Sequence, residues 1–317
     1  MSRIHDALKK AELERTGGLT PERLEPPPEL GALEATQAGP ALRGGAENSA
    51  ATLTQTHGES MSPVTVEEAL LANCPQPAWN PDTKMMLFFD EQNHGLGTEQ
   101  FRTLRSHLYH LRKELPLKRL LITSPLPKEG KTFVAGNLAH ALVRQEDRRV
   151  LLVDADLRVS GLHLWLGAPS TPGLSDYLAG GVDEFAVIQR GPIDNLFFIP
   201  GGKSVSNPSE LIGNGRLKTL LDRLAPSFDW IILDSPPATL VSDAKLLADV
   251  CDGVLMVVLA SSTPFDLAQK SCQEFRGKRI LGVALNRAQG ASIYSSFQYY
   301  NQQKPGDTSG EGKPPKQ

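Results

Sequence analysis

The stretch SPLPKEGKT, residues 124–132, decides how this chain folds. An apolar run, LKRLLIT, precedes it at residues 117–123, and a helical pattern follows at residues 131–144. Gly-Lys-Thr at the start of a helix directs backbone N–H groups at a phosphate, brings a lysine to its oxygens and offers a hydroxyl to Mg²⁺. The first glycine of the usual phosphate-loop pattern is absent, because Pro125 stands there. We predict a nucleotide-binding loop; the alternative is an exposed helix N-terminus that carries GKT without a ligand.

Two further apolar runs end in aspartate. LLVDADLR places Asp154 and Asp156 after the run at residues 149–153, and WIILDSPP places Asp234 after residues 230–233. The C-terminal ends of parallel strands are where α/β proteins bind ligands. We expect one of the first two carboxylates to hold Mg²⁺ and the other to orient or deprotonate a nucleophile, while Asp234 holds the metal through its water. The alternative for the first pair is an acidic turn that caps the next helix.

The remaining chain alternates short apolar runs with helical patterns. Further strands are expected at residues 196–199, 253–260 and 280–285, and helices at residues 98–115, 208–224 with an interruption at 213–215, 243–248 and 265–275. Continuous apolar strands that alternate with helices are typical of a parallel sheet covered on both faces. The sequence therefore predicts an α/β fold with a mostly parallel β-sheet and helices on both faces.

Composition divides the chain into parts. Residues 17–62 contain no Phe, Trp, Tyr, Ile or Val, so this stretch buries too little apolar surface to offset its ordering entropy. We expect a short amphipathic helix at residues 1–16, a disordered linker at 17–84, a P-loop domain at 85–290 and a flexible tail at 291–317. The first helix would dock a partner, or it would be a frayed terminus without a role.

The overall composition excludes several classes of protein. The 33 Lys+Arg and 36 Asp+Glu residues give a net charge of −3, which argues against a basic nucleic-acid binder. The three cysteines have no CxxC spacing and the seven histidines do not cluster with them, so neither a disulfide framework nor a zinc site is expected. No apolar run reaches the ~20 residues of a membrane span, and the first residues lack the apolar region of a secretion signal. We expect a cytoplasmic protein without direct membrane insertion.

Together, the three motifs resemble those of the bacterial tyrosine kinases (BY-kinases) of capsule and exopolysaccharide systems, P-loop proteins within the MinD/ParA-like ATPases. PKEGKT resembles the Walker A motif of that family, VLLVDADLR its Walker A′ motif and IILDSPP its Walker B motif; the likeness extends over residues 87–286. It implies a P-loop NTPase fold, ATP and Mg²⁺ as cofactors, and an ATP-dependent protein-tyrosine autokinase that regulates exopolysaccharide or capsule synthesis and export.

The resemblance also implies roles for individual residues. Catalysis would fall to Lys131, Asp154 and Asp156, and the metal to Thr132, Asp154 and Asp234. The nucleotide would contact Lys128, Glu129, Gly130, Lys131, Thr132, Phe133 and Asn286. Asn286 is included because an asparagine at the end of the last strand contacts adenine in related ATPases.

Two short elements suggest assembly and a substrate. The first consists of Glu99, Arg102 and Arg105, and the second of Tyr294, Tyr299 and Tyr300. The first reproduces the ExxRxxR element that helps subunits of the family form rings; the alternative is a solvated charged ridge. The second resembles the C-terminal tyrosine cluster that a neighbouring subunit phosphorylates in trans, whereas most tyrosines are simply core or surface aromatics.

The family acts beside polysaccharide-export proteins of the inner membrane. The resemblance therefore implies recruitment to the inner face of the membrane by a transmembrane activator that resembles a chain-length regulator. In this sequence, Lys128 replaces the usual glycine of PGEGK, so the position either tolerates a side chain or adds a second phosphate-facing cation. The alternative functions are a MinD/ParA-like ATPase switch that modifies no protein and a nucleotide-binding regulatory partner without kinase activity.

Overall fold

The computed structural model describes residues 74–89, 95–145 and 147–288. The expected first helix, the linker as far as residue 73 and the tyrosine-containing tail lie outside the described residues. The description below therefore concerns the expected P-loop domain and the segment directly before it.

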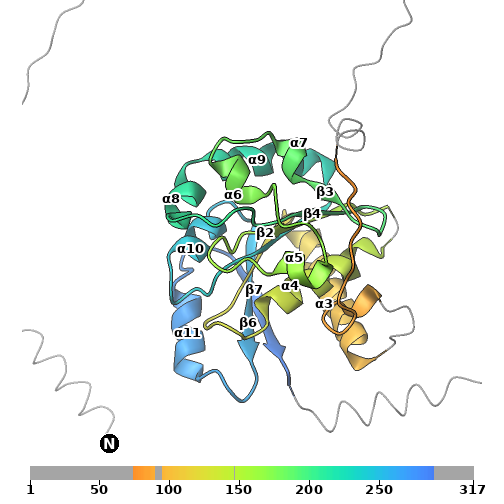
Figure 1. Ribbon diagram of the computed structural model, residues 1–317. Helices are drawn as coiled ribbons and strands as arrows, with labels where there is room; N and C mark the ends of the chain where they lie inside the picture. The colour runs from red at the N-terminus through yellow and green to blue at the C-terminus, as the bar shows by residue number, and fades with distance from the viewer. Residues whose placement is uncertain (1–73, 90–94, 146, 289–317) are drawn as a thin grey trace, which may run out of the picture. The chain divides into compact units, whose positions relative to one another are not determined.

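A seven-stranded sheet forms the centre of this domain (Figure 1). The strands are β1 (Arg119–Thr123), β2 (Val150–Asp154), β3 (Gln189–Arg190), β4 (Leu196–Ile199), β5 (Trp230–Asp234), β6 (Gly253–Leu259) and β7 (Ile280–Asn286). Their order is β3-β4-β2-β5-β1-β6-β7. The pair β3–β4 is antiparallel, and every other neighbouring pair is parallel.

Helices cover both faces of the sheet, as Figure 1 shows. On one face lie the 3-10 turn η1 (Leu87–Phe89) and the helices α3 (Leu96–Glu114), α4 (Lys131–Val143) and α5 (Leu162–Leu166). On the other lie α6 (Leu174–Leu178), α7 (Glu184–Val187), α8 (Pro208–Gly213), α9 (Arg216–Leu224), the 3-10 turn η2 (Ala225–Ser227), α10 (Asp243–Ala248) and α11 (Phe265–Gln273). The predicted α/β architecture is confirmed.

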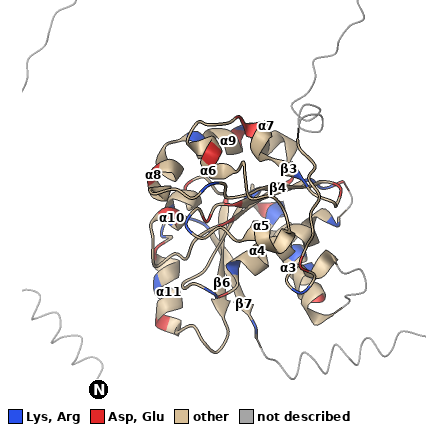
Figure 2. Ribbon diagram, viewed as in Figure 1, with Lys and Arg blue, Asp and Glu red and all other residues tan. Residues whose placement is uncertain are grey.

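The strands supply side chains to both hydrophobic layers. Along β2, Leu151 and Val153 are buried in one layer, whereas Val150 and Leu152 are buried in the other. Successive side chains of a strand point to opposite faces, so a strand buried on both sides must be apolar at every position. The apolar runs of the sequence are explained by this double burial, and charged residues lie mainly on helices and loops (Figure 2).

One expected break is found, and several short elements were missed. Residues 208–224 form α8 and α9, divided where Gly215 adopts a left-handed backbone with φ +84°, within the predicted interruption. The strand β3 and the helices α5, α6 and α7 were not predicted. These elements contain only two to five residues, which is too short for a periodic pattern to be visible.

Residues 74–84 were assigned to the linker, but they lie against the domain. The indole of Trp79 meets the ring of Phe198 edge to face at 5.9 Å. The backbone N–H of Asp82 donates to the carbonyl oxygen of Trp165 at 2.9 Å. The expected boundary at residue 85 is therefore too late. An extended segment gives no periodic signal, so its attachment depends on contacts that the sequence does not display.

The strand order brings the three motifs together. Strand β5 lies between β1 and β2, and Asp234 is in register with both Ile122 and Asp154. The loops after β1, β2 and β5 therefore leave the sheet at the same edge and at neighbouring positions. None of the helices in the described part of the chain is long and apolar enough to cross a membrane.

Candidate active site

The loop at residues 124–130 connects β1 to the N-terminus of α4. Its last residue, Gly130, has φ +97°, and a Cβ atom there would lie 2.0 Å from Nδ2 of Asn286. Only glycine fits this position, because both the backbone angle and the space exclude a side chain. Lys128 also has a left-handed backbone, with φ 64°, which explains why glycine is the usual residue in this motif.

Residues distant in sequence hold this loop in place. Glu129 is almost completely buried, and its carboxylate accepts hydrogen bonds from the backbone N–H of Leu126 at 2.7 Å and from the hydroxyl of Thr263. Nδ2 of Asn286 donates to the carbonyl oxygen of Glu129 at 2.8 Å. Sequence reasoning missed Thr263, since a threonine after β6 carries no motif. Glu129, which was predicted to contact the nucleotide, supports the loop through these hydrogen bonds and does not line the cavity described next.

A cavity of about 740 Å³ opens beside the loop. Of the residues predicted to bind nucleotide, Lys128, Gly130, Lys131, Thr132, Phe133 and Asn286 line it. Asp156 and Arg158 also line it. The structure therefore gathers these residues around one cavity. Asp154 and Asp234 are fully buried and are not among its lining residues.

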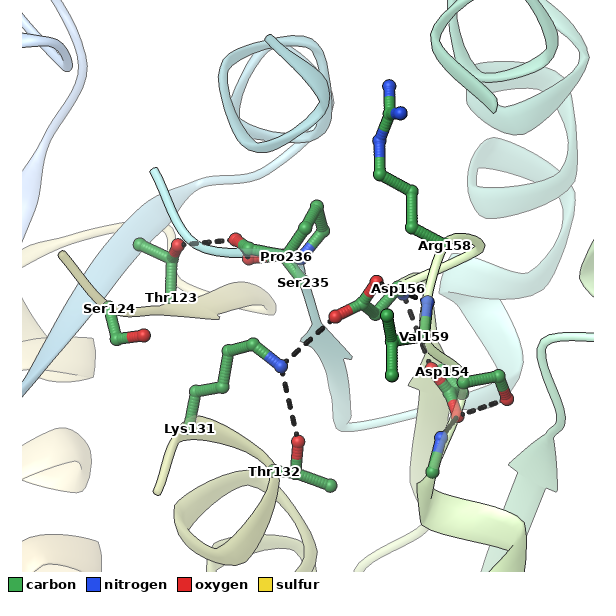
Figure 3. Close-up of polar contacts among 12 residues, drawn as sticks. Thr123, Ser124, Lys131, Thr132, Asp154, Asp156, Arg158, Val159, Ser235 and Pro236 are labelled. Atoms are coloured by element: carbon green, nitrogen blue, oxygen red, sulfur yellow. Dashed lines mark hydrogen bonds and ion pairs between the residues drawn. The ribbon is translucent and has the colours of Figure 1, made fainter. Parts of the chain in front are cut away.

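Lys131 and Asp156 form an ion pair in the wall of this cavity (Figure 3). The ammonium Nζ lies 3.1 Å from Oδ2 of Asp156 and 3.4 Å from the hydroxyl of Thr132. Burial lowers the pKa of Lys131, but the negative charges of Asp234 and Asp156 more than compensate, so that the pKa lies above its ordinary value. The lysine therefore remains a cation at the start of α4, where a phosphate group would bind.

The carboxylate of Asp154 stabilises the loop that follows β2. Its Oδ2 accepts hydrogen bonds from the hydroxyl of Ser160 at 2.7 Å and from the backbone N–H groups of Gly161 and Leu162 at 3.1 Å each. Its Oδ1 accepts from the backbone N–H of Asp156 at 3.3 Å. Burial raises the pKa of Asp154 to about 6, although these hydrogen bonds oppose the shift. The two predicted carboxylates are thus in different situations: Asp154 is committed to the loop, and Asp156 faces Lys131.

Asp234 is buried with one carboxylate oxygen unsatisfied. Among the described residues, no hydrogen-bond partner contacts its Oδ1. Burial raises the pKa of Asp234 to about 7, while the charge of Lys131 opposes the shift. A buried, unpaired carboxylate oxygen is costly unless a cation or proton accompanies it. Together with the hydroxyl of Thr132, which lies 3.4 Å from Nζ of Lys131 at the start of α4, this oxygen fits a Mg²⁺ ion.

The described residues contain no group of three or more His, Cys, Asp or Glu side chains that could hold a metal by themselves. Mg²⁺ usually takes one or two protein oxygens and completes its octahedron with water and substrate phosphates. The hydroxyl of Thr132 and Oδ1 of Asp234, which has no partner in the described part of the chain, offer such a small donor set.

A second charged network lies beside the cavity and was not predicted. The guanidinium of Arg158 donates to both carboxylate oxygens of Asp243, at 2.7 and 3.1 Å, and the hydroxyl of Ser209 donates to Oδ1 of Asp243 at 2.5 Å. Burial raises the pKa of Asp243, but the hydrogen bonds from Arg158 and Ser209 and the charge of Arg158 together outweigh it, and the pKa lies below its ordinary value. This network ties the loop after β2 to α8 and α10. DLR and SDA are its sequence signals.

The ExxRxxR residues are satisfied within the chain. Glu99 forms an ion pair with Arg102, and Nη1 of Arg105 donates to the carbonyl oxygen of Ala141 at 2.8 Å. The second contact joins α3 to the C-terminal end of α4. Tyr294, Tyr299 and Tyr300 lie outside the described residues.

Comparisons with known proteins identify the family. No family model matches the chain. Tyrosine-protein kinase YwqD of Bacillus subtilis (strain 168) is 31% identical over 207 residues, which cover 65% of this chain and 86% of YwqD. The chain belongs to the bacterial tyrosine kinase family. The resemblance indicated by the three motifs is confirmed.

Other members of this family differ in length. Tyrosine-protein kinase ptk of Acinetobacter johnsonii is 31% identical over 199 residues, which cover 62% of this chain and 27% of ptk. The chain thus spans about a quarter of that relative. Among solved structures, the kinase domain of the Escherichia coli tyrosine kinase ETK matches with 34% identity and a TM-score of 0.57, over 61% of this chain and 78% of that one. The predicted P-loop NTPase fold is confirmed as that of a kinase domain.

Proposed function

We propose that this chain is an ATP- and Mg²⁺-dependent protein-tyrosine autokinase. The observation that carries the proposal is the pair of Lys131 and Asp156, 3.1 Å apart in a cavity of about 740 Å³ beside a phosphate loop. A cation for the transferred phosphoryl group and a carboxylate for the attacking hydroxyl are the two groups that phosphoryl transfer requires next to a nucleotide.

Asp156 and Lys131 have different roles in the proposed reaction. The tyrosine oxygen attacks the γ-phosphorus, the bond from phosphorus to the β,γ-bridging oxygen breaks, and ADP leaves with that electron pair. The carboxylate of Asp156 orients the hydroxyl and receives its proton. Lys131 stabilises the negative charge on the transferred group, an effect that is strong because the ammonium is preorganised and mostly buried. Positioning and charge stabilisation supply most of the acceleration in such reactions.

The metal would be held by the hydroxyl of Thr132 and by Asp234, whose Oδ1 is free of protein partners in the described part of the chain. When bound, Mg²⁺ neutralises charge on the β- and γ-phosphates. Asp154 contributes to this centre indirectly, because its oxygens hold the turn that carries Asp156.

The nucleotide would bind along the start of α4. Gly130 and the neighbouring backbone N–H groups would contact its phosphates, as helix N-termini commonly do. Lys128, Phe133 and Asn286 line the same cavity and would contact the remainder of the ligand. Glu129 would not contact the nucleotide directly; it would keep the loop in shape through its hydrogen bonds with Thr263 and Leu126.

The substrate and partners proposed here follow the family. The substrate would be the tail of a second copy, phosphorylated in trans at Tyr294, Tyr299 and Tyr300. Ring-like assembly would involve Glu99, Arg102 and Arg105. A transmembrane activator that resembles a chain-length regulator would recruit this cytoplasmic protein to the inner face of the membrane, where it would regulate exopolysaccharide or capsule synthesis and export.

A Lys131→Ala variant tests this function. We expect mass spectrometry to find phosphate on the tail tyrosines of the wild-type protein incubated with ATP and Mg²⁺, and none on the variant, whose circular dichroism should be unchanged. Lys270→Ala, which removes an exposed lysine on α11, should behave as wild type. Release of inorganic phosphate without phosphotyrosine would indicate an ATPase switch instead. ATP binding with neither product would indicate a regulatory partner.

A further inference from the structure

Another cavity, of about 950 Å³, lies at the end of α4 that is remote from the phosphate loop. It is lined by one face of α3 and by the segment between α4 and β2. Because α4 has 13 residues, each of which advances a helix by about 1.5 Å, roughly 20 Å separates this end from Lys131. Five of the lining side chains can carry a positive charge: Arg105, His110, Lys113, Arg144 and Arg148. We refer to this cavity as the basic groove.

The sequence of α3 accounts for one wall of the basic groove. Arg105, Tyr109 and Lys113 follow one another at intervals of four residues, so they lie on the same face of the helix. The other wall comes from Arg144, which follows the last residue of α4, and from the residues after it. The packing of α3 against α4 thus brings together cations that are far apart in the sequence.

Three of these cations have no carboxylate partner in the described part of the chain. Arg105 and Arg144 donate to the carbonyl oxygens of Ala141 and Phe88, which are neutral. Lys113 makes neither a hydrogen bond nor an ion pair with any described residue. Their charges are therefore not compensated by the described residues.

The other charges do not neutralise the basic groove. Arg148 forms an ion pair with Asp229 at 2.8 Å, so these two charges offset each other. Nε of Arg148 is buried without a hydrogen-bond partner among the described residues. Asp147 is the carboxylate among the described lining residues, and Glu146 lies outside the described residues. In a chain whose net charge is −3, the described lining of this cavity thus carries an excess of positive charge.

The chemistry of the basic groove suits an anion with several charges. Cations that line one cavity repel one another, and a bound polyvalent anion relieves that repulsion. Guanidinium and ammonium groups donate charge-assisted hydrogen bonds, and phosphate oxygens are strong acceptors for them. The hydroxyl of Tyr109 accepts from Nε1 of Trp230 at 3.3 Å, so its own hydrogen can be donated to a ligand. Both walls of the groove therefore offer donors to phosphate oxygens.

The basic groove offers little to an apolar partner. Its volume lies within the range of about 300–1,000 Å³ that is usual for small-molecule sites. Six large apolar side chains of the described residues are more than half exposed, and none of them lines the groove: Val159, Leu164, Leu240, Phe265, Val283 and Leu285. A protein segment would find no place there for the large side chains that commonly anchor protein–protein interfaces. A small anion is therefore favoured over a protein partner.

We propose that the basic groove binds a soluble oligophosphate, an anion of two or more linked phosphate groups. Arg105, Lys113 and Arg144 hold its oxygens, and the hydroxyl of Tyr109 donates to one of them. The site is separate from the cavity that contains Lys131, so the proposal does not depend on the kinase function. Arg105 also belongs to the proposed assembly element, and the variants below therefore leave it unchanged.

Isothermal titration calorimetry with inorganic tripolyphosphate tests the site. All chains carry Lys131→Ala, which removes the cation of the phosphate loop and leaves the basic groove intact. We expect one molecule to bind per chain, with a Kd that rises about tenfold in a Lys113→Gln, Arg144→Gln double variant, because charge-assisted hydrogen bonds are lost. Absence of binding to the parent chain would overturn the proposal.

The control removes the same charge elsewhere. Lys270→Gln, Arg276→Gln changes exposed positions in α11 and directly after it, and this pair should leave the Kd for tripolyphosphate unchanged. An equal rise of the Kd in both double variants would show that the anion is attracted by the overall charge of the chain, and the proposal would be wrong.

A single variant separates ligand binding from folding. Lys113→Gln removes a side chain without a described partner, whereas Arg144→Gln also loses the contact with Phe88. We expect the single variant to have the melting temperature of its parent and a Kd raised about threefold. An unchanged Kd in Lys113→Gln would show that the lysine does not contact the anion and would overturn the assigned site.

Two other ligands test the class of anion. Orthophosphate should bind at least about tenfold more weakly than tripolyphosphate, because one phosphate group meets fewer of the cations. Equal affinities would mean a site for a single phosphate and would contradict the oligophosphate assignment. Co-sedimentation with phosphatidylglycerol vesicles that depends on Lys113 and Arg144, without binding of tripolyphosphate, would assign the groove to a membrane surface and would likewise overturn the proposal.

Discussion

The two loops that carry the reacting groups are stabilised in opposite ways. The Walker A loop, residues 124–130, depends on Thr263 and Asn286, which are 134 and 157 positions away from Glu129. The Walker A′ turn, residues 154–162, closes on itself, because Asp154 accepts hydrogen bonds from residues at most eight positions ahead. The carboxylate that holds the first loop therefore depends on residues that follow β6 and end β7, whereas the carboxylate that holds the second is bound by its own turn, which Arg158 additionally ties to Asp243.

Within each loop, the residue that holds the backbone differs from the residues that line the cavity. In the Walker A′ turn, one aspartate is committed to structure and its neighbour two positions later faces the reaction space. In the Walker A loop, Glu129 has the structural task and the flanking lysines line the cavity. In each loop, a buried carboxylate holds the backbone while adjacent side chains line the cavity.

The largest expected effect comes from replacing Asp156, and the matching replacement of Asp154 tests whether the two aspartates have different roles. Asp156→Ala should reduce kcat for tyrosine phosphorylation by about a hundredfold or more, the usual contribution of a general base, with a small change in the melting temperature. Asp154→Ala should lower the free energy of unfolding by about 1–3 kcal/mol, because it leaves buried N–H donors without an acceptor. Thermal melts and initial rates on the same preparations check both. The opposite assignment of the two effects would refute the division of roles.

A smaller effect, on the pH dependence of stability, is expected from His140 in α4, the helix that follows the Walker A loop. Burial lowers the pKa of His140 to about 3, and neither of its ring nitrogens has a hydrogen-bond partner among the described residues. The folded protein keeps this ring neutral, whereas the unfolded chain protonates it below its ordinary pKa of 6.5. Stability is thus present above that value and is lost as the pH falls toward 3. At pH 5 this loss amounts to about 2 kcal/mol.

Denaturant melts of His140→Leu against pH check that effect. The variant should show a flatter loss of stability between pH 7 and pH 5 than wild type. His107→Leu, at an exposed position of α3, is the control and should leave the slope unchanged. An identical slope in all three proteins would show that His140 is not protonated differently in the two states.

The distant support of the Walker A loop can be removed with little change in shape. Thr263→Val keeps the volume and deletes the hydroxyl that donates to Glu129. We expect an approximately tenfold loss in ATP affinity by calorimetry, equivalent to about 1.4 kcal/mol, because the loop is less well ordered before binding. Ser262→Ala, at the exposed neighbouring position, should bind ATP as wild type does. Equal affinity in the Thr263 variant would mean that the loop forms without support from the hydroxyl of Thr263.

The smallest effect concerns Lys128. Lys128→Gly should raise the free energy of unfolding by about 0.5–1 kcal/mol, because glycine adopts the left-handed backbone without strain. The same change should weaken ATP binding severalfold, since a cation is removed from the cavity wall. Lys128→Ala removes the cation and keeps the strain, so only the affinity should fall. If glycine leaves the affinity unchanged, the lysine does not contact the phosphates.

Much of this site could be predicted because its motifs are local. PKEGKT, DAD and LDSPP each follow an apolar run, and the ends of parallel strands gather at one edge of a sheet. The positions of Lys131, Asp156 and Asp234 follow from that rule. The repeated alternation of apolar runs and helical patterns likewise predicted a sheet with both faces covered, since only double burial makes whole strands apolar.

Only the tertiary structure separated the roles within those motifs. Asp154 and Asp156 have the same chemistry and nearly the same position in the sequence; what distinguishes them is that three donors from residues 160–162 converge on one and Lys131 approaches the other. Thr263 carries no sequence signal, because a threonine after β6 acquires a function only from the Glu129 side chain that the strand order places beside it. The sequence determined which strands end in reactive groups. Packing determined which of the two aspartates lines the cavity, because the hydrogen bonds from residues 160–162 hold Asp154 within its own turn.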